Sequence, residues 1–333
     1  MAVVLIRGAG IAGSCCSRLL GEAGLRVSME GLLRPKLPAV MLGESTQRLL
    51  LDVFGREDLF VGLPRILRRV VAWGRDCEPL TLPHSAVVVS EQELLGRIQQ
   101  GLGQSEPMKC EDPDWTIFAS APLGASSVAH HFGSRFAAAS PVGLRAKCDA
   151  ETCWIESLES GWLFLLPDGK GTGWLLSVGN SVESDLEQSR LIKDQIVELG
   201  PSHGTFASHP RLAMPLSEPG WLACGTAALG FDPLCGDGIG NATREAILGS
   251  AVIRAAIDGG DVDSLVACYR ARLLAGFKRH IALCFDFYRS GRAGSWWDKQ
   301  LDDLERGLAW CSQEFSDRPV IRYRLNGFTL ETA

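Results

Sequence analysis

Apolar positions at the start of the chain form two short continuous runs, separated by a glycine-rich turn and a helical pattern. Residues 2–6 are all apolar, which is typical of a strand buried on both faces of a parallel sheet. Residues 14–22 carry the small and apolar side chains of a closely packed helix, and a second strand is predicted over residues 25–29. The pattern therefore predicts a β-α-β unit.

Further along, the pattern changes from strands joined by helices to strands that follow one another directly. A capping box of Ser90 and Glu93 opens a predicted helix that ends near residue 101. Short alternating runs over residues 137–181 predict an antiparallel sheet. The other predicted elements are strands over residues 69–73, 80–82, 86–89, 115–119 and 220–224, and helices over residues 185–199, 239–257 and 263–288.

The turn of the N-terminal unit, residues 8–13, is called the first glycine loop. Gly8 permits a tight turn, Gly10 lets the backbone approach a pyrophosphate, and Gly13 lets the helix lie close to the sheet. Glu30 ends the second strand, where a carboxylate can accept a hydrogen bond from a ribose hydroxyl. An acidic residue here favours FAD or NAD over NADP. Arg7 either reaches the phosphates or points out of the end of the sheet.

Residues 225–238 form a second glycine loop, which follows a predicted strand and precedes a helix. Exposed amides at such a helix start favour partial negative charge. Asp232 in this loop and His84 near a strand end are the candidate catalytic residues for proton transfer. Each has a structural alternative, a helix–loop cap for Asp232 and a hydrogen-bonded strand-end histidine for His84. Cys235 either influences a ligand in this loop or is a packed thiol.

Composition narrows the function classes. The chain has 333 residues, is 46% hydrophobic and has a net charge of −6, which disfavours binding to nucleic acid or to an anionic membrane. No apolar run approaches the ~18 to 20 residues that span a bilayer. Because the first strand begins at residue 2, no secretory leader is expected, and a cytoplasmic location is predicted.

The eleven cysteines are scattered without paired zinc spacing, so reduced, buried thiols are expected and no metal site is predicted. The vicinal pair Cys15 and Cys16 lies in the first helix, where tight packing explains it. Surface positions are expected for four histidines, His130, His131, His203 and His209.

Taken together, these stretches resemble the FAD-dependent aromatic hydroxylase superfamily, in its tryptophan-halogenase-like branch. The resemblance covers residues 1–290 and is carried by the first glycine loop with Glu30, by Gly43-Glu44-Ser45, by Ala72-Trp73-Gly74 and by residues 220–239. Within that branch the chain is most similar to flavoproteins that hydroxylate a tryptophan of a partner protein during quinone-cofactor maturation, as in quinohemoprotein amine dehydrogenases.

The resemblance implies an α/β fold with three parts. The expected parts are a Rossmann-like, discontinuous FAD-binding domain (residues 1–68, 90–136 and 208–262), an inserted antiparallel β-sheet substrate domain (residues 69–89 and 137–207) and a helical C-terminal region (residues 263–333). Around FAD, the expected contacts are Gly8, Gly10, Ala12 and Gly13 to the pyrophosphate and Glu30 to the ribose, with Glu44, Ser45, Arg48, Gly225, Thr226, Pro233, Gly236, Gly238 and Ile239 bordering the cofactor. Thr226 stands where the family usually has the aspartate that binds the ribityl chain, so a charged hydrogen bond is lost.

The implied activity is that of an FAD-dependent monooxygenase that uses O2 and an electron donor to hydroxylate an indole or phenol ring. A tryptophan within a peptide or partner protein is one candidate substrate. The family's middle Asp-Gly motif is not recognisable in residues 114–127, which argues against direct use of NAD(P)H. Residues 162–167 carry only a degraded halogenase signature, and no residue can be assigned as the halogenase lysine. The alternatives are a flavin oxidase, reductase or halogenase, and an FAD-binding assembly factor that has lost catalysis.

Overall fold

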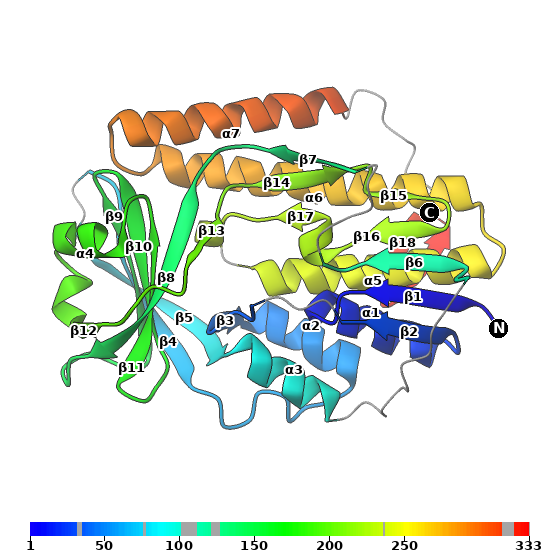
Figure 1. Cartoon of the computed structure of the whole chain (residues 1–333), viewed down its shortest axis with the longest axis horizontal. Helices are drawn as coiled ribbons and strands as arrows, with labels where there is room; N and C mark the ends of the chain where they lie inside the picture. The colour runs from blue at the N-terminus through cyan, green and yellow to red at the C-terminus, as the bar shows by residue number, and fades with distance from the viewer. Residues whose placement is uncertain are drawn as a thin grey trace.

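A five-stranded, mainly parallel sheet forms one end of the computed structural model (Figure 1). The structure describes residues 1–31, 35–75, 78–100, 112–120, 127–235, 237–314 and 323–332. The strand order is β15-β16-β6-β1-β2, with only β15 antiparallel to its neighbour. Its strands are β1 Val3–Arg7, β2 Arg26–Glu30, β6 Trp115–Phe118, β15 Ser217–Glu218 and β16 Trp221–Ala223. Val4 and Ile6 are fully buried, as the continuous apolar run predicts.

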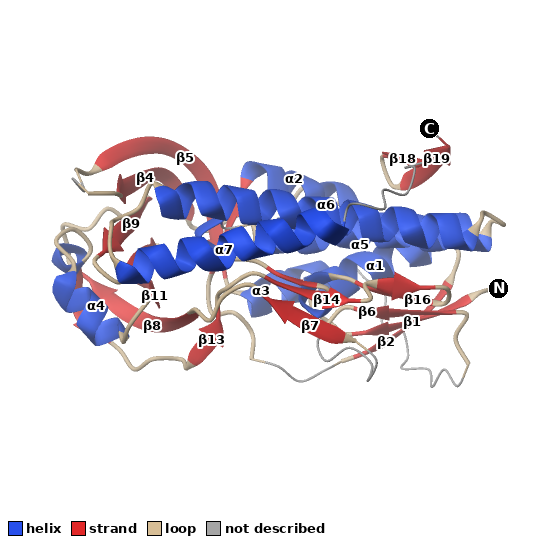
Figure 2. Cartoon of the chain, turned by 90° about the horizontal axis from the view of Figure 1, so that it is seen from above, coloured by secondary structure: helices blue, strands red, loops and turns tan. Residues whose placement is uncertain are grey.

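Helices cover one face of this sheet (Figure 2). The long helices of the described structure are α1 Ile11–Glu22, α2 Glu44–Phe54, α3 Glu91–Gln99, α5 Gly238–Ile257, α6 Val262–Arg289 and α7 Ser295–Glu314. Cys15 and Cys16 are fully buried on α1, which confirms the packing interpretation of this pair. The predicted cap of α3 is confirmed, because the Ser90 hydroxyl accepts from the Glu93 amide at 3.1 Å. None of the helices within the described ranges combines the length and apolar character needed to cross a bilayer.

A nine-stranded sheet forms the other end of the molecule (Figure 1). Its order is β12-β8-β11-β10-β9-β4-β5-β3, β13 pairs with β8, and all pairs are antiparallel except β4 with β9. The strands are β3 Val40–Gly43, β4 Arg65–Ala72, β5 Leu80–Val89, β8 Phe136–Leu144, β9 Thr152–Leu158, β10 Gly161–Pro167, β11 Thr172–Val178, β12 Ile196–Leu199 and β13 Thr205–Ala207. Leu163, Leu165 and Leu175 on one face form a core of their own, whereas Trp162 on the other face joins the main core.

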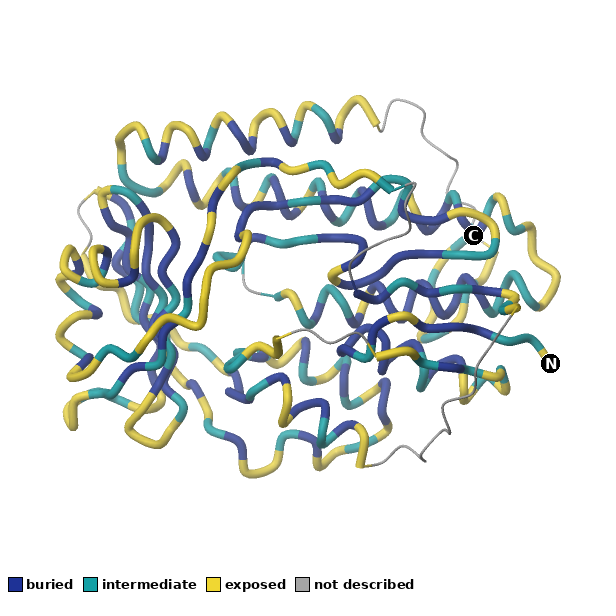
Figure 3. Tube along the Cα trace, in the orientation of Figure 1, coloured by how far each residue is buried: buried dark blue, intermediate teal, exposed yellow. Residues whose placement is uncertain are grey.

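A three-stranded sheet connects the two ends. It consists of β7 Val128–His131, β14 Arg211–Met214 and β17 Leu229–Gly230, in the order β17-β14-β7. Figure 3 shows buried positions along the strands of the two larger sheets, while the outer helix α7 alternates between buried and exposed positions. A hairpin of β18 Tyr323–Asn326 and β19 Thr329–Thr332 closes the chain, and Arg272 of α6 donates to the Tyr323 carbonyl at 2.7 Å.

The helix predicted over residues 185–199 is wrong. A short α4, Val182–Gln188, capped by Ser181, is followed by a 3-10 turn (η1, Lys193–Gln195) and then by β12. The buried carboxylate of Glu156 accepts from the amides of Arg190 at 2.7 Å and Ile192 at 3.0 Å, so these amides cannot continue a helix. This partner lies on another strand, outside the reach of local periodicity.

Candidate functional site

The first glycine loop adopts a conformation that its glycines make possible. Gly8 has a φ of +122°, and a Cβ there would lie 2.5 Å from the Ser120 hydroxyl. A Cβ on Gly13 would lie 1.9 Å from the Gly8 carbonyl oxygen, so α1 can lie this close to the turn only without a side chain. The Gly8 amide donates to the Glu30 carbonyl at 2.8 Å, which joins the loop to the end of β2. The arrangement has the tight turn and close helix that the sequence predicts.

Arg7 and Glu30 face each other at the ends of β1 and β2. The two residues are in register, and Arg7 Nε lies 3.3 Å from Glu30 Oε2. Both side chains are about half exposed, at 48% and 56%. Arg7 therefore points out of the end of the sheet, which was one of its two interpretations. Glu30 lies at the edge where the parallel strands end, and its contact with a ribose stays a prediction.

The second glycine loop lies directly against the first. Gly225 has a φ of +57°, and a Cβ there would lie 2.9 Å from Ala12 Cβ and 3.4 Å from the Ala119 carbonyl oxygen. Ala12 belongs to α1, so residues more than two hundred positions apart meet where β1, β6 and β16 end. Thr226 is exposed, and its carbonyl accepts from Arg211. The structure thus brings the two loops together in one place.

Glu245 of α5 is a buried acid that the sequence interpretation missed. Its Oε2 accepts from the Gly225 amide at 2.6 Å, so this side chain holds the start of the second glycine loop. Burial raises the pKa of the Glu245 carboxyl to about 8. The acid is therefore mostly protonated at neutral pH. A glutamate within an otherwise small and apolar helix face was the available signal.

The starts of α2 and α5 also meet at this place. Thr46 Oγ1 donates to Asp237 Oδ1 at 2.5 Å, and Arg244 Nη1 donates to Asp237 Oδ2 at 2.7 Å. Glu44, Ser45 and Arg48 are exposed on the first turns of α2. Of the remaining predicted contacts, Pro233 lies in a 3-10 turn (η3, Pro233–Cys235), Gly238 and Ile239 begin α5, and Gly236 lies outside the described residues.

Three helices begin at this site with their amides available. In the described structure, no side chain caps the first amides of α1, α2 or α5, which begin after Gly10, Gly43 and Asp237. Ser90 and Ser181 cap α3 and α4, which begin elsewhere, whereas α6 also begins elsewhere and has no side-chain cap. Uncapped amides and helix dipoles attract negative charge. Together with the glycine loops, where a Cβ would fill the space, this set of residues fits the pyrophosphate of FAD.

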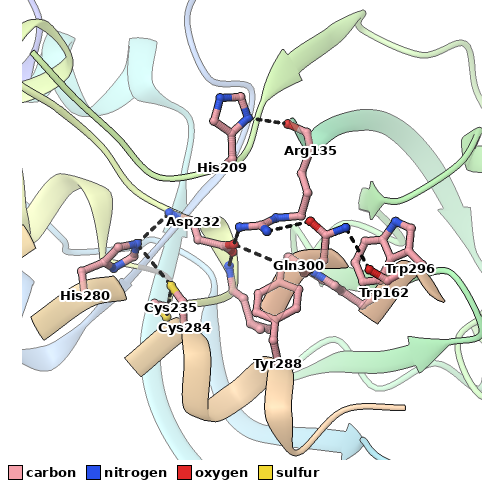
Figure 4. Close-up of polar contacts among 11 residues, drawn as sticks. Arg135, Trp162, His209, Asp232, Cys235, His280, Cys284, Tyr288, Trp296 and Gln300 are labelled. Atoms are coloured by element: carbon pink, nitrogen blue, oxygen red, sulfur yellow. Dashed lines mark hydrogen bonds and ion pairs between the residues drawn. The ribbon is translucent and has the colours of Figure 1, made fainter. Parts of the chain in front are cut away.

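Asp232 lies within the second glycine loop and is fully buried (Figure 4). Its Oδ2 accepts from Arg135 Nη2 at 2.7 Å and from the Tyr288 hydroxyl at 3.0 Å. Its Oδ1 accepts from the Leu234 amide at 2.8 Å, which closes the 3-10 turn η3. The geometry favours the helix–loop cap among the two interpretations of Asp232, and its catalytic role stays a prediction.

Arg135 connects the second glycine loop to the larger sheet and to the C-terminal helices. It donates to Gln300 Oε1 of α7 at 2.8 Å, and its guanidinium lies 4.6 Å from the centre of the Tyr288 ring. The Tyr288 hydroxyl accepts from Trp162 Nε1 of β10 at 3.1 Å. Sequence reasoning missed Arg135, Tyr288 and Gln300, because their shared partner is visible only in the folded chain.

Two histidines next to this network are buried, and Figure 4 shows both. His280 Nε2 accepts from the Asp232 amide at 2.9 Å, and burial lowers the pKa of His280 to about 4. His209 Nδ1 donates to the Arg135 carbonyl at 3.0 Å, while its Nε2 lies 2.9 Å from His131 Nδ1. The surface position expected for His209 is therefore wrong, because the ring is buried and hydrogen-bonded to the Arg135 carbonyl.

His84 lies on β5, and its Nε2 is 3.2 Å from Arg69 Nη2 of β4. Burial, and then the Arg69 charge, lower the pKa of His84, so the neutral ring accepts from the guanidinium. Arg69 is opposite Leu82 and Cys153, and residues directly opposite share a face of a sheet. The structure therefore shows His84 as the hydrogen-bonded histidine of the structural alternative. A catalytic role of His84 stays a prediction.

The face of the larger sheet that carries Arg69 is also the face of Trp162. Trp162 is opposite Ser157, and Cys153, Ile155 and Ser157 alternate along β9 on that same face. Because Trp162 contacts Tyr288, this face is directed toward the second glycine loop. Several of its apolar side chains are only half-buried: Val71, Ile155, Phe164, Trp174 and Leu176.

Two adjacent tryptophans, Trp296 and Trp297, lie at the start of α7. Trp297 is fully buried and donates to the carbonyls of Leu158 and Glu159, both at 3.1 Å. Trp73 of the Ala-Trp-Gly motif packs edge-on against it, with ring centres 5.4 Å apart. Trp296 is half-buried beside them. The pair therefore fixes α7 to the β9–β10 hairpin.

No protein-family model matches the sequence, and no curated protein matches it significantly. Solved structures do share its fold. CmlS, a flavin-dependent halogenase, has a TM-score of 0.79 at 18% identity, over 99% of this chain and 84% of that one. QhpG, a peptidyl tryptophan dihydroxylase essential for tryptophylquinone cofactor biogenesis, has a TM-score of 0.76 at 18% identity, over 99% and 86%. The myxobacterial chondrochloren halogenase CndH, a FAD-dependent halogenase, has a TM-score of 0.75 at 15% identity, over 97% and 93%.

These comparisons confirm the predicted fold class. The chain has the α/β fold of flavin-dependent halogenases and of QhpG along nearly its whole length. The predicted resemblance to the halogenase-like branch is therefore confirmed at the level of the fold. The domain boundaries stay a prediction, and the structure adds that β3 and the beginning of β4 pair within the larger sheet.

Proposed function

We propose that this chain is an FAD-dependent monooxygenase that hydroxylates an indole or phenol ring, and that its substrate is a tryptophan residue of a partner protein in quinone-cofactor maturation. The observation that carries the proposal is the contact between the two glycine loops. Gly225 of one loop lies where a Cβ would be 2.9 Å from Ala12, beside the start of α1. This contact supports the proposal that both loops hold one extended cofactor.

The residues at the site divide the work of holding the cofactor. The amides at the start of α1 bind the pyrophosphate, and Glu30 binds the adenosine ribose. Glu44, Ser45 and Arg48 would border the cofactor, and Pro233, Gly238 and Ile239 would hold its isoalloxazine, with the amides of Gly238 and Ile239 available to donate to it. When bound, FAD supplies the redox chemistry by which one oxygen atom of O2 enters the aromatic ring. Asp232 and Arg135 keep the second glycine loop in place beside it.

The larger sheet supplies the face on which the aromatic substrate lies. Its half-buried apolar residues, including Ile155 and Trp174, form a surface directed toward the second glycine loop. His84 is the candidate group for moving a proton on this face, and its acceptor nitrogen would have to exchange the hydrogen bond from Arg69 for one from the substrate. The similarity in fold to QhpG supports a tryptophan inside a polypeptide over a free small molecule.

The reductant is proposed to be a separate protein, because the motif linked to a nicotinamide donor is not recognisable in the sequence. The proposed compartment is the cytoplasm. The cysteines in the described part of the chain are unpaired thiols, which suits a reducing compartment.

The first test is FAD binding. We expect the purified protein to be yellow or to become yellow when FAD is supplied. Gly13→Ala should abolish binding, because its Cβ would lie 1.9 Å from the Gly8 carbonyl oxygen. Gly21→Ala is the matched control on the same helix, since nothing lies within 4 Å of its Cβ. A protein that stays colourless with saturating FAD would end the proposal.

The second test is the mass of the product. Candidate tryptophan-containing partners, made in cells with and without this protein, are compared by mass spectrometry. A gain of oxygen atoms on tryptophan supports hydroxylation. Exchange of hydrogen for a halogen indicates a halogenase, and loss of two hydrogens indicates an oxidase. If Gly13→Ala, shown to lack FAD, still supports maturation of the partner, the chain is an assembly factor rather than an enzyme.

A further inference from the structure

Three side chains that can bind a metal meet beside the second glycine loop. Cys235 comes from that loop, while His280 and Cys284 are one helical turn apart on α6 (Figure 4). The two sulfur atoms and a ring nitrogen all lie within 4.8 Å of one another. Cys284 and His280 are buried and Cys235 is half-buried. A helical pair at this spacing with one residue from a distant loop is a common way to build a metal site.

Two of the three ligand separations are close to those of a tetrahedral site, and the third is within 4.8 Å. Cys235 Sγ lies 3.3 Å from Cys284 Sγ, and Cys284 Sγ lies 3.4 Å from His280 Nε2. Zinc bonds of about 2.3 Å to sulfur and about 2.0 Å to nitrogen, at tetrahedral angles, place neighbouring ligand atoms about 3.6–3.8 Å apart. Shifts of about half an ångström would bring these two ligand separations to that geometry. Side-chain rotation of this size does not require the helix to move.

The imidazole already presents the correct nitrogen. His280 Nε2 accepts a hydrogen bond from the Asp232 amide at 2.9 Å, and an amide can only donate. Nε2 therefore carries its lone pair, in the tautomer that a metal needs. An ion at this position would take the place of the Asp232 amide at Nε2.

The charge balance also suits a metal ion in this environment. Two thiolates offset the two positive charges of a divalent ion, so the occupied site would be neutral. The carboxylate of Asp232, whose amide contacts His280, is already paired with Arg135 at 2.7 Å. A neutral complex avoids an uncompensated charge in the protein interior.

We propose that Cys235, His280 and Cys284 form a binding site for one thiophilic metal ion, Zn²⁺, with a fourth position for water. The thiolate pair selects a soft ion over Mg²⁺ or Ca²⁺. The ion joins the second glycine loop to α6. The site does not depend on the proposed monooxygenase activity, and its test reads metal rather than product.

The test uses the whole chain, reduced and freed of metal, with and without added FAD. We expect one Zn²⁺ per chain by elemental analysis, and with Co²⁺ the thiolate charge-transfer absorption and d–d bands of a tetrahedral ion. Cys235→Ser and Cys284→Ser should each weaken Zn²⁺ binding at least about 100-fold, since loss of an outer partner alone costs about 10–100-fold. Cys268→Ser, at a buried cysteine on the same helix but outside the cluster, should bind like the wild type.

Far-ultraviolet circular dichroism separates loss of the site from loss of the fold. The half-buried Cys235 variant keeps the test valid if the buried Cys284 variant does not fold. Absence of Zn²⁺ binding by the reduced wild type would overturn the proposal. So would binding that survives the Cys235→Ser substitution, or a Cys235–Cys284 disulfide in the protein as isolated from cells.

Discussion

Replacing Glu245 by glutamine should make the protein more stable at neutral pH. The side chain is buried, and its pKa in the folded chain is about 8, against 4.5 in the reference state. Between these values the folded chain holds a proton that the unfolded chain releases. The contribution of Glu245 to the unfolding free energy is therefore fully present below pH 4.5, and it is lost as the pH rises toward about 8. Glutamine does not ionise, but it keeps an oxygen that can accept from the Gly225 amide, which lies 2.6 Å from Glu245 Oε2 in the wild type.

The magnitude follows from the difference between the two pKa values. Each pH unit between them costs the wild type about 1.4 kcal/mol of unfolding free energy. At pH 7, which is about two and a half pH units above 4.5, ionisation of Glu245 in the unfolded chain lowers the unfolding free energy of the wild type by about 3 kcal/mol. We therefore expect Glu245→Gln to gain about 3 kcal/mol at pH 7 and close to nothing near pH 4.5.

The assay is urea unfolding of both proteins at several pH values from 5 to 8, with FAD either absent from both or saturating in both. The quantity to plot is the variant's unfolding free energy minus that of the wild type, because the other ionisable groups cancel in the difference. It should rise with pH. Glu187→Gln, at an exposed position of α4, is the matched control and should give a difference near zero throughout. A difference for Glu245→Gln that does not change with pH would refute the reasoning.

Three further substitutions test the geometry of the site. Gly225→Ala should weaken FAD binding at least about tenfold, measured by flavin fluorescence, because the left-handed backbone costs about 1–2 kcal/mol and the new Cβ lies 2.9 Å from Ala12 Cβ. Asp232→Asn should cost about 3–5 kcal/mol in urea unfolding, because it leaves a buried arginine without its counter-charge. Thr46→Val should cost about 1 kcal/mol in urea unfolding, because it removes the 2.5 Å hydrogen bond between the starts of α2 and α5.

Each of these predictions has an outcome that contradicts it. Gly62→Ala has a positive φ but nothing within 4 Å of its Cβ, so an equal loss of FAD affinity there would mean that the contact with Ala12 is not the cause. An Asp232→Asn variant as stable as the wild type would mean that the Arg135 charge is balanced by another group. Unchanged unfolding in Thr46→Val would show that the junction of α2 and α5 does not depend on this hydrogen bond.

The sequence was informative where structure depends on neighbouring residues. Residues 2–30 predict β1 and β2 to within one residue at each end, because an apolar run between required glycines is a local feature. The helix is predicted with its correct end, but α1 begins at Ile11, three residues before the predicted start. The resemblance to FAD-dependent hydroxylases implied that both glycine loops serve one cofactor, and the structure places the two loops in contact. The fold class followed from the resemblance that these elements carry.

Sequence reasoning did not reveal features that depend on a partner far away in the sequence. The Glu156 carboxylate ends α4 from another strand, which no periodicity over residues 185–199 can reveal. Asp232 was singled out from its place in the second glycine loop, and its partner Arg135, 97 positions away, could not be identified from the sequence. Glu245 and Thr46 escaped notice for the same reason, since an acid in a helix and a threonine at a helix start are ordinary until their neighbours are known.

The support that α7 gives to the centre of the molecule limits how far the chain can be shortened. Gln300 holds Arg135, and Trp297 is bound to the carbonyls at the tip of the β9–β10 hairpin. Both residues lie beyond the stretch that carries the recognisable motifs. A fragment ending after α6 would retain every glycine of both loops. It would still lose Gln300, which holds the arginine of the Arg135–Asp232 ion pair. A minimal version of this protein therefore has to be chosen from its contacts, because a boundary drawn after the last motif would discard part of the framework.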